Sequence, residues 1–271
     1  PTPMTVLRAC RLAAALLLAV AAGCSSQDDN IDTPIVRPVS IAPAGIYAGT
    51  WASTRTGVSK AVTVFVDNKS TMMMFDDTGA LIASGAYTTV EAARSINWSA
   101  RVFVPGTETD PDTGETTATT VVTTLTAQGG YAEQASLLLS YAGSDGDSGT
   151  ISVSYDKTAY ETRSDVSLIQ GNWGIKDAFG AATISIAINA GGSFFGTDVN
   201  NCNYSGSFTI LDQQYNLYAV SVVTQCAGSA ANSTTIGLAT LKKPSGTTTT
   251  STLVAVTANT SAALLWKLKP L

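Results

Sequence analysis

The chain has 271 residues, of which 13% are charged, with 15 basic and 20 acidic side chains and a formal net charge of −5 at pH 7. An acidic chain repels a phosphate backbone, so we expect no nucleic-acid partner. The sequence contains no histidine. This excludes Ser-His-Asp and Cys-His catalysis, histidine metal sites and histidine pH switches.

The first predicted element is an export signal over residues 1–23. Arg8 and Arg11 precede an unbroken apolar run, residues 12–22. This run is too short to cross a bilayer as a helix but has the length of a signal-peptide core. No later apolar stretch approaches the roughly 18 residues of a spanning helix. Removal of the signal would take away two arginines and no acid, which leaves a net charge of −7.

Small residues, Ala21, Ala22 and Gly23, lead from this run to Cys24. The arrangement resembles the lipobox of bacterial lipoproteins, although Ala21 stands where that family usually has leucine. The resemblance implies that Cys24 becomes the mature N-terminus and carries palmitate-type acyl chains, which would make a stable membrane anchor. Ser25, in place of an inner-membrane retention aspartate, implies the outer membrane and leaves the periplasmic or surface face open. The alternative is an ordinary secretory signal cut near Gly23, which releases a soluble protein.

Residues 24–44 are predicted to form the lipidated N-terminus and an extended linker, because three prolines and three aspartates occur there without apolar periodicity. Residues 45–162 and 163–271 are each predicted to contain seven or eight short strands. Segments such as AVTVFVD (61–67) and ATISIAIN (182–189) alternate at period two, as a strand with one buried face does. Turns rich in Gly, Asn, Asp and Pro separate the strands, and no amphipathic helix of useful length interrupts them.

An internal repeat of about 122 residues relates the two halves. Sliding the chain by this distance places Gly49 and Trp51 on Gly171 and Trp173 without a gap. We therefore expect an all-β fold of two tandem antiparallel meander domains, each a small eight-stranded barrel or barrel-like sandwich, because closure removes exposed strand edges. The alternative is one 16-stranded membrane barrel, which the lipobox and the sparse girdle aromatics disfavour.

The segments GTW and GNW, which open the two halves, resemble the Gly-x-Trp that starts the first strand of calycin barrels, the lipocalins and avidins. YAGTW followed by VTVFVDNK is also similar to the barrels of transferrin-binding-protein-like surface lipoproteins. The resemblance implies structural roles for Trp51 and Trp173, packed at equivalent ends of two barrels. An unrelated β domain with a buried tryptophan at its base is the alternative.

Four cysteines occur in the chain. Cys10 would leave with the signal and Cys24 is the predicted anchor, which leaves Cys202 and Cys226 in an oxidising compartment. We expect these two to form a disulfide. Their spacing is not that of a redox-active CxxC pair, so the predicted role is structural.

No motif in the sequence predicts catalysis, a cofactor or a metal. Ser154 and Lys157 have Ser-x-x-Lys spacing, but at the end of a predicted strand instead of a helix start. DPDTGE, residues 110–115, begins like a calcium loop yet offers few further ligands, and we interpret it as a solvated hairpin loop. Met72, Met73 and Met74 could suggest copper, but alternate faces of a strand separate them, and core filling is the prediction.

These observations predict a non-enzymatic cell-envelope lipoprotein, tethered to the outer membrane through Cys24, whose β domains bind a ligand or protein partner or serve envelope structure. The alternative is a lipocalin-like carrier of a small apolar ligand, which needs a cavity of several hundred Å³ inside a barrel. A third hypothesis, a glycan-active enzyme, needs two close carboxylates in a cleft.

Overall fold

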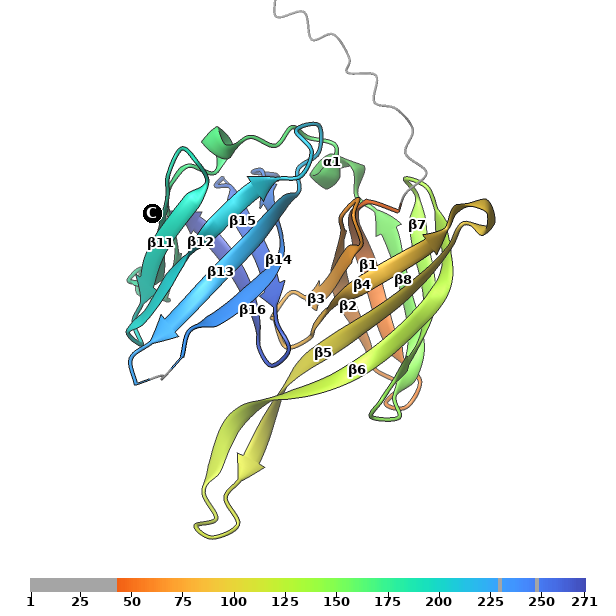
Figure 1. Ribbon diagram of the computed structural model, residues 1–271, viewed down its shortest axis with the longest axis horizontal. Helices are drawn as coiled ribbons and strands as arrows, with labels where there is room; N and C mark the ends of the chain where they lie inside the picture. The colour runs from red at the N-terminus through yellow and green to blue at the C-terminus, as the bar shows by residue number, and fades with distance from the viewer. Residues whose placement is uncertain (1–42, 229–230, 247–248) are drawn as a thin grey trace, which may run out of the picture. The chain divides into compact units, whose positions relative to one another are not determined.

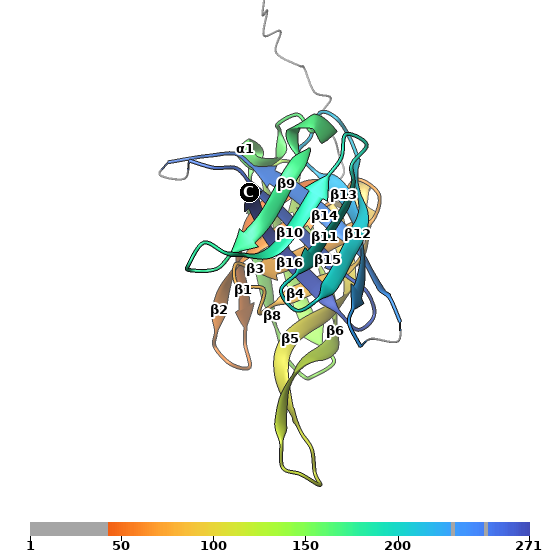
Figure 2. The same cartoon turned by 90° about the vertical axis from the view of Figure 1, so that its left-hand side faces the viewer.

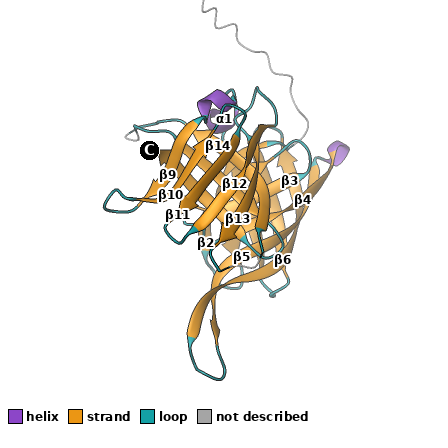
Figure 3. Cartoon of the chain, turned by 60° about the vertical axis from the view of Figure 1, so that its left-hand side comes forward, coloured by secondary structure: helices purple, strands orange, loops and turns teal. Residues whose placement is uncertain are grey.

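The computed structural model describes residues 43–271 apart from 229–230 and 247–248 (Figure 1). The predicted signal and anchor residue Cys24 lie outside the described residues. The described chain forms two closed eight-stranded antiparallel barrels in tandem, and Figure 3 shows strands making up most of it. The predicted fold of two meander barrels is confirmed, and the single 16-stranded barrel is excluded.

Each barrel is a meander in which every strand pairs with the next and the last strand pairs with the first. The first barrel consists of β1 (Gly45–Ser53), β2 (Ser59–Val66), β3 (Thr71–Asp76), β4 (Ile82–Val90), β5 (Ser95–Thr109), β6 (Thr116–Ala132), β7 (Ser136–Gly143) and β8 (Ser148–Tyr155). The second consists of β9 (Gly171–Lys176), β10 (Ala182–Ile188), β11 (Ser193–Asp198), β12 (Cys202–Ile210), β13 (Tyr218–Cys226), β14 (Ser233–Lys242), β15 (Thr252–Ala258) and β16 (Ala263–Pro270).

Short helical turns connect these strands: η1 (Glu91–Ala93), α1 (Lys157–Tyr160) and η2 (Val166–Leu168). In the part of the chain that the structure describes, no helix has the length and apolar character needed to span a membrane. The expected boundary between the halves, after residue 162, falls between α1 and η2, in the segment that joins the two barrels.

Alternating side chains fill the interior of each barrel. In the first barrel the interior cluster includes Trp98, 1% exposed, with Met72 and Met74, both fully buried. In the second, Phe194 packs against Phe208 and Trp266, with ring centroids 5.3 and 6.1 Å away. The period-two patterns therefore place one face of each strand inside a barrel, as predicted, and core filling by Met72 and Met74 is confirmed.

A third apolar cluster draws its residues from the outer faces of both barrels. Phe65, Met73 and Phe75 come from β2 and β3, and the second barrel contributes residues such as Leu238 and Val256. All of these side chains are at most 2% exposed. Because both faces of β3 and β15 are buried, these strands are apolar almost throughout, which is the pattern of strands covered on two sides. We call this set the shared cluster.

The joining segment is held by polar contacts as well. Asp156 accepts a hydrogen bond from the Ala159 N–H at 2.9 Å and so caps α1. The Asn216 side chain, from the β12–β13 loop, donates to the carbonyl oxygens of Ala159 (3.0 Å) and Leu241 (2.8 Å). Tyr160 stacks on Tyr215 at 4.6 Å between ring centroids. The connection between the barrels is thus an ordered part of the fold.

Glycine permits the close approach of neighbouring strands in these narrow barrels. A Cβ atom on Gly85 would lie 1.8 Å from the Ser99 carbonyl oxygen, and one on Gly196 would lie 2.1 Å from the carbonyl oxygen of Ser185. No side chain fits at such distances. Glycine within a strand marks the points where another backbone comes near.

The prediction that Trp51 and Trp173 occupy equivalent ends is wrong. The 122-residue offset holds for the second and third strands, where Val62 pairs with Asp76 and Ile184 with Asp198. In the first hairpin, however, Trp51 pairs with Lys60, whereas Trp173 pairs with Ile186. Val64 is the residue of the first barrel that corresponds to Ile186, and it pairs with Tyr47, four residues before Trp51.

That residue, Tyr47, makes the same contact as Trp173. The Tyr47 hydroxyl donates to the Pro43 carbonyl oxygen at 2.8 Å, and Trp173 Nε1 donates to the Ile169 carbonyl oxygen at 2.7 Å. In both cases the acceptor lies four residues earlier in the chain. The first hairpins of the two barrels therefore place aromatic residues four positions apart in the sequence match at the same end of the core, and a gap-free match cannot detect this difference in register.

Candidate functional site

The β5–β6 hairpin continues beyond the rim of the first barrel, as Figures 1 and 2 show in yellow and green. β4 pairs with β5 only as far as Phe103, and β7 pairs with β6 only from Leu125 onward. Residues 104–124 therefore form a two-stranded ribbon and its turn without a neighbouring strand. We call this ribbon the arm.

The side chains of the arm are mostly in contact with solvent. Residues 107–122 are exposed throughout, and two of them are large and apolar, Val121 at 41% and Val122 at 36% exposure. At its base, Val104 packs against the interior cluster of the first barrel. A two-stranded ribbon by itself is marginally stable in water, so contacts at the base and backbone pairing between the two strands hold the arm.

The tip of the arm is an acidic turn. Asp110 Oδ1 accepts hydrogen bonds from the backbone N–H groups of Asp112 (2.8 Å) and Thr113 (3.2 Å). These N–H groups lower the pKa of Asp110 below its usual range. Among the described residues, no three Asp, Glu, Cys or His side chains are grouped as a metal site would need. Residues 110–115 are exposed and form the turn of the hairpin, which agrees with the predicted loop.

The arm leaves the rim opposite to the one where the described chain enters the first barrel. Gly45, at the entry, pairs with Val66, and the neighbouring Ile46 carbonyl accepts the Asp156 N–H at 2.8 Å. The arm emerges at the other rim, beside the β7–β8 turn, where the Ser144 N–H donates to the Thr124 carbonyl oxygen at 2.8 Å. The entry point and the arm are thus separated by the length of the barrel.

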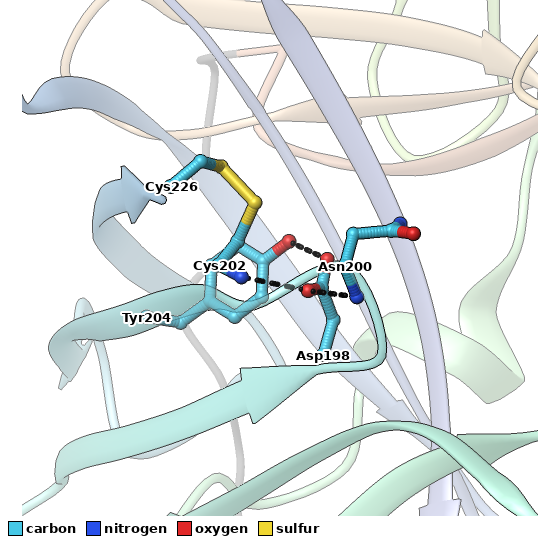
Figure 4. The surroundings of a disulfide bond; sticks show 5 residues. All are labelled: Asp198, Asn200, Cys202, Tyr204 and Cys226. Carbon is cyan, nitrogen blue, oxygen red and sulfur yellow. Dashed lines mark hydrogen bonds between the residues drawn. A yellow bond between two sulfur atoms is a disulfide. The ribbon is translucent and has the colours of Figure 1, made fainter. Parts of the chain in front are cut away.

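The predicted disulfide is present in the second barrel (Figure 4). Cys202 and Cys226 are directly opposite one another on β12 and β13. Asp198 Oδ1 accepts the N–H groups of Asn200 and Cys202, both at 2.9 Å, and its Oδ2 accepts the Tyr204 hydroxyl at 2.9 Å. Burial raises the pKa of Asp198, but these hydrogen bonds outweigh it and the pKa is lowered. The disulfide and this carboxylate close one rim of the second barrel.

A similar carboxylate lies at the arm-bearing rim of the first barrel. Asp147 accepts hydrogen bonds from the Ser53 hydroxyl at 2.6 Å and the Tyr141 hydroxyl at 2.9 Å. Arg55 lies 3.9 Å from it and pairs more closely, at 2.9 Å, with Asp145. Burial raises the pKa of Asp147. The hydrogen bonds from the two hydroxyl groups lower it by more than burial raises it, so the pKa lies below its usual range. Both acids are structural partners of turns and strand ends.

The structure does not bring the Ser-x-x-Lys residues together as a catalytic pair. Ser154 is exposed on β8, and the Lys157 ammonium lies 3.9 Å from Glu161 along α1. Trp51 packs against Tyr141 at 5.4 Å between ring centroids, inside the first barrel. Trp173 is 4% exposed and Cys24 is not among the described residues.

Sequence reasoning identified the two strands of the hairpin but not the arm. The segment TTATTVVTTLTA was expected to be a strand, and it is part of β6. A signal for the arm was present: residues 116–124 contain threonine, valine and alanine without a period-two apolar face. A strand without an apolar face has no core to cover. Comparison of the chain with protein-family models, with curated proteins and with solved structures finds no match in any of the three.

Proposed function

We propose that this protein is a non-enzymatic lipoprotein of the bacterial cell envelope, tethered at its N-terminus through Cys24, that presents the arm to a macromolecular partner. The observation that carries the proposal is the placement of the arm at the rim opposite to chain entry. A tether at the entry side would leave the arm pointing away from the membrane. The lipobox resemblance of the segment before Cys24 supports the tether.

The double barrel suits the role of a rigid support. The shared cluster buries apolar side chains of both barrels against one another, including Phe65 and Val256 at 0% exposure. Burial of a large apolar side chain stabilises a fold by roughly 1.5–3 kcal/mol. The chain entry and the base of the arm both belong to the first barrel, at opposite rims of one closed sheet.

The carrier alternative receives less support from the geometry. A lipocalin-like carrier needs an open interior, and the interior of the first barrel is filled by side chains such as Trp98 and Met74, at 1% and 0% exposure. Packed interiors of small eight-stranded barrels leave little room for a ligand. Native mass spectrometry before and after denaturing extraction tests this directly, because a carrier would lose a reproducible extra mass.

The tether is tested by Cys24→Ala. We expect this variant to lose fatty-acid labelling and to leave the membrane fraction, because the acyl chains supply the anchoring energy. Labelling that is unchanged in Cys24→Ala would contradict the anchor.

The role of the arm is tested by replacing residues 105–120 with Asn-Gly, which joins Val104 to Val121 by a two-residue hairpin loop. We expect this armless variant to keep its fatty-acid label and to unfold within about 0.5 kcal/mol of the parent protein, because the removed side chains are exposed. Urea unfolding followed by tryptophan fluorescence measures the difference. Failure of the armless variant to fold would make the arm a structural element and would contradict its proposed role.

A further inference from the structure

We propose that the arm pairs, strand edge to strand edge, with the arm of a second copy of this chain. The pairing would use the free edge of β6, residues 118–122, in an antiparallel two-fold arrangement. This inference rests on the proposed function only in taking the arm as a docking element, and it does not require the lipid anchor.

The backbone of β6 offers unpaired hydrogen-bonding groups along this edge. At its inner end, Thr124 directs its N–H to Ser144 Oγ (3.1 Å) and its carbonyl oxygen to the Ser144 N–H (2.8 Å), both on the side away from β5. Backbone groups alternate sides along an antiparallel strand. Ala118, Thr120 and Val122 therefore direct their N–H and C=O groups away from β5, and within the described residues these groups have no hydrogen-bond partner.

The side chains of this edge favour pairing. Residues 116–124 contain only threonine, valine and alanine, with no charge, proline or glycine. β-branched residues are favoured in strands. Natural proteins protect free edges with charges, prolines or bulges. Residues 116–124 contain neither a charged residue nor a proline.

The opposite edge of the same ribbon is protected. Pro105 pairs with Thr120, so the position where its N–H is missing faces outward from the ribbon. Glu108, near the tip of β5, adds a charge to this edge. The contrast between two edges of one ribbon indicates that the β6 edge is the side used for contact.

A second copy is the occupant that fits this edge best. A two-fold axis at Thr120 sets the β6 edge on itself and places Ala118 of each copy opposite Val122 of the other, so that outward-facing backbone groups meet in register. The N–H and C=O of each would then bond across the new pair as in any antiparallel sheet. The exposed Val121 and Val122 would each gain a cross-strand neighbour, which contributes roughly 0.2–1 kcal/mol per pair.

Charges along the arm also favour the antiparallel arrangement. The tip carries Asp110, Asp112 and Glu115, whereas Arg101, exposed and paired with Thr124, lies at the base. No ion pair of Arg101 is found within the described part of the chain. Antiparallel pairing about Thr120 places the Thr116 residues of the two copies eight residue steps apart, roughly 26 Å, and so separates the two acidic tips. It also brings each tip toward the base, which carries Arg101 together with the ion pair of Arg55 and Asp145.

The test compares two proline variants of one cross-strand pair. Ala118 and Thr107 are opposite one another in the arm, on the β6 and β5 edges respectively. Both have outward-facing N–H groups, so Ala118→Pro and Thr107→Pro remove equivalent donors from the two edges and none from the ribbon itself. Sedimentation equilibrium of the full chain in a mild detergent measures the dimer dissociation constant over a range of protein concentrations.

We expect a concentration-dependent dimer in the parent protein. Ala118→Pro should raise its dissociation constant by at least about tenfold, the equivalent of about 1.4 kcal/mol, while Thr107→Pro should leave it within about twofold. A parent protein that is monomeric at every concentration, or an equal loss in both variants, would overturn the pairing.

Cross-linking provides a second measurement that does not depend on proline. A short bis-maleimide should join two copies of a Thr120→Cys variant, because the two-fold axis passes through this residue, and should not join copies of Thr107→Cys. Equal cross-linking at both positions would contradict the register. If the parent protein is monomeric while the armless variant still folds, self-pairing is refuted and the proposed function is not. If the parent protein dimerises but carries no fatty-acid label, the lipid anchor is refuted and self-pairing is not.

Discussion

The fifth strands of the two barrels, β5 and β13, occupy the same topological place and end differently. In the first barrel, β5 and β6 run past their neighbours and form the arm. In the second, β13 stays paired with β12 along its whole length, and its last residue is Cys226, bonded to Cys202 at the rim. The fifth strand therefore ends at a disulfide bond in the second barrel and extends into solvent in the first.

The difference shows how the end of a hairpin is decided by the strands beside it. β13 has a strand partner on both sides as far as Thr224, its last two residues pair with β12 alone, and the disulfide joins its end to β12. β5 loses its outer partner after Phe103 and continues with six more residues that pair with β6 alone. An extension of this kind is tolerated because, apart from Val104 at its base, it adds no large side chain to the core.

The largest effect on stability should come from removal of the disulfide in the second barrel. Replacing both Cys202 and Cys226 by alanine should lower the free energy of unfolding by about 3 kcal/mol, because the disulfide closes a loop of 24 residues in the unfolded chain. Urea unfolding under non-reducing conditions measures this loss.

Reduction of the parent protein provides the control for the alanine pair, and it should shift the unfolding midpoint in the same direction. The armless variant, altered in the β5–β6 hairpin of the first barrel, should shift the midpoint far less. A loss below about 1 kcal/mol in the double alanine variant would show that the rim of the second barrel does not depend on its disulfide.

An intermediate effect should distinguish Trp173 from Trp51. Trp173 is 4% exposed and donates to the Ile169 carbonyl oxygen, whereas Trp51 is half-buried near the other end of its barrel. Both phenylalanine variants remove the same atoms, so Trp173→Phe should cost about 1 kcal/mol more than Trp51→Phe, the usual contribution of one hydrogen bond.

Tyr47→Phe extends this comparison to the residue that occupies the place of Trp173 in the first barrel. It removes only the hydroxyl that donates to the Pro43 carbonyl oxygen and should cost about 1 kcal/mol. Thermal unfolding of the three variants provides the values. If Trp51→Phe were as costly as Trp173→Phe, the four-residue shift of register would not explain the role of these rings.

The smallest effect should appear in the pH dependence of stability. The pKa values of Asp147 and Asp198 are lowered in the folded protein, so each carboxylate adds stability above the ordinary aspartate pKa of about 4. That stability is lost as the pH falls through the lowered values.

The double variant Asp147→Asn with Asp198→Asn should therefore flatten the decline in stability between about pH 5 and pH 3. The expected change is under about 1 kcal/mol per site, because desolvation opposes the hydrogen bonds at both carboxylates. Scanning calorimetry across this range measures the slope. A slope identical to that of the parent protein would assign the acid sensitivity to other carboxylates.

Local pattern alone was sufficient to predict the strands, the two-barrel class and the cysteine pair. Alternation at period two and turn residues are properties of short segments, and the predicted assignment of Cys10 to the signal and Cys24 to the anchor left only Cys202 and Cys226 to pair with one another. The separation of Met72 and Met74 from Met73 onto two faces follows from the same alternation.

Tertiary structure alone decided the register of the first hairpin, the shared cluster and the arm. Trp173 in the second barrel and Tyr47 in the first occupy the same position at the end of the core, and each donates to a carbonyl oxygen four residues earlier. A comparison of the two sequences alone does not reveal this equivalence. The arm exists because β4 and β7 end before β5 and β6 do. Where one strand stops relative to its neighbours depends on pairing between distant segments, and no single segment of the sequence contains that information.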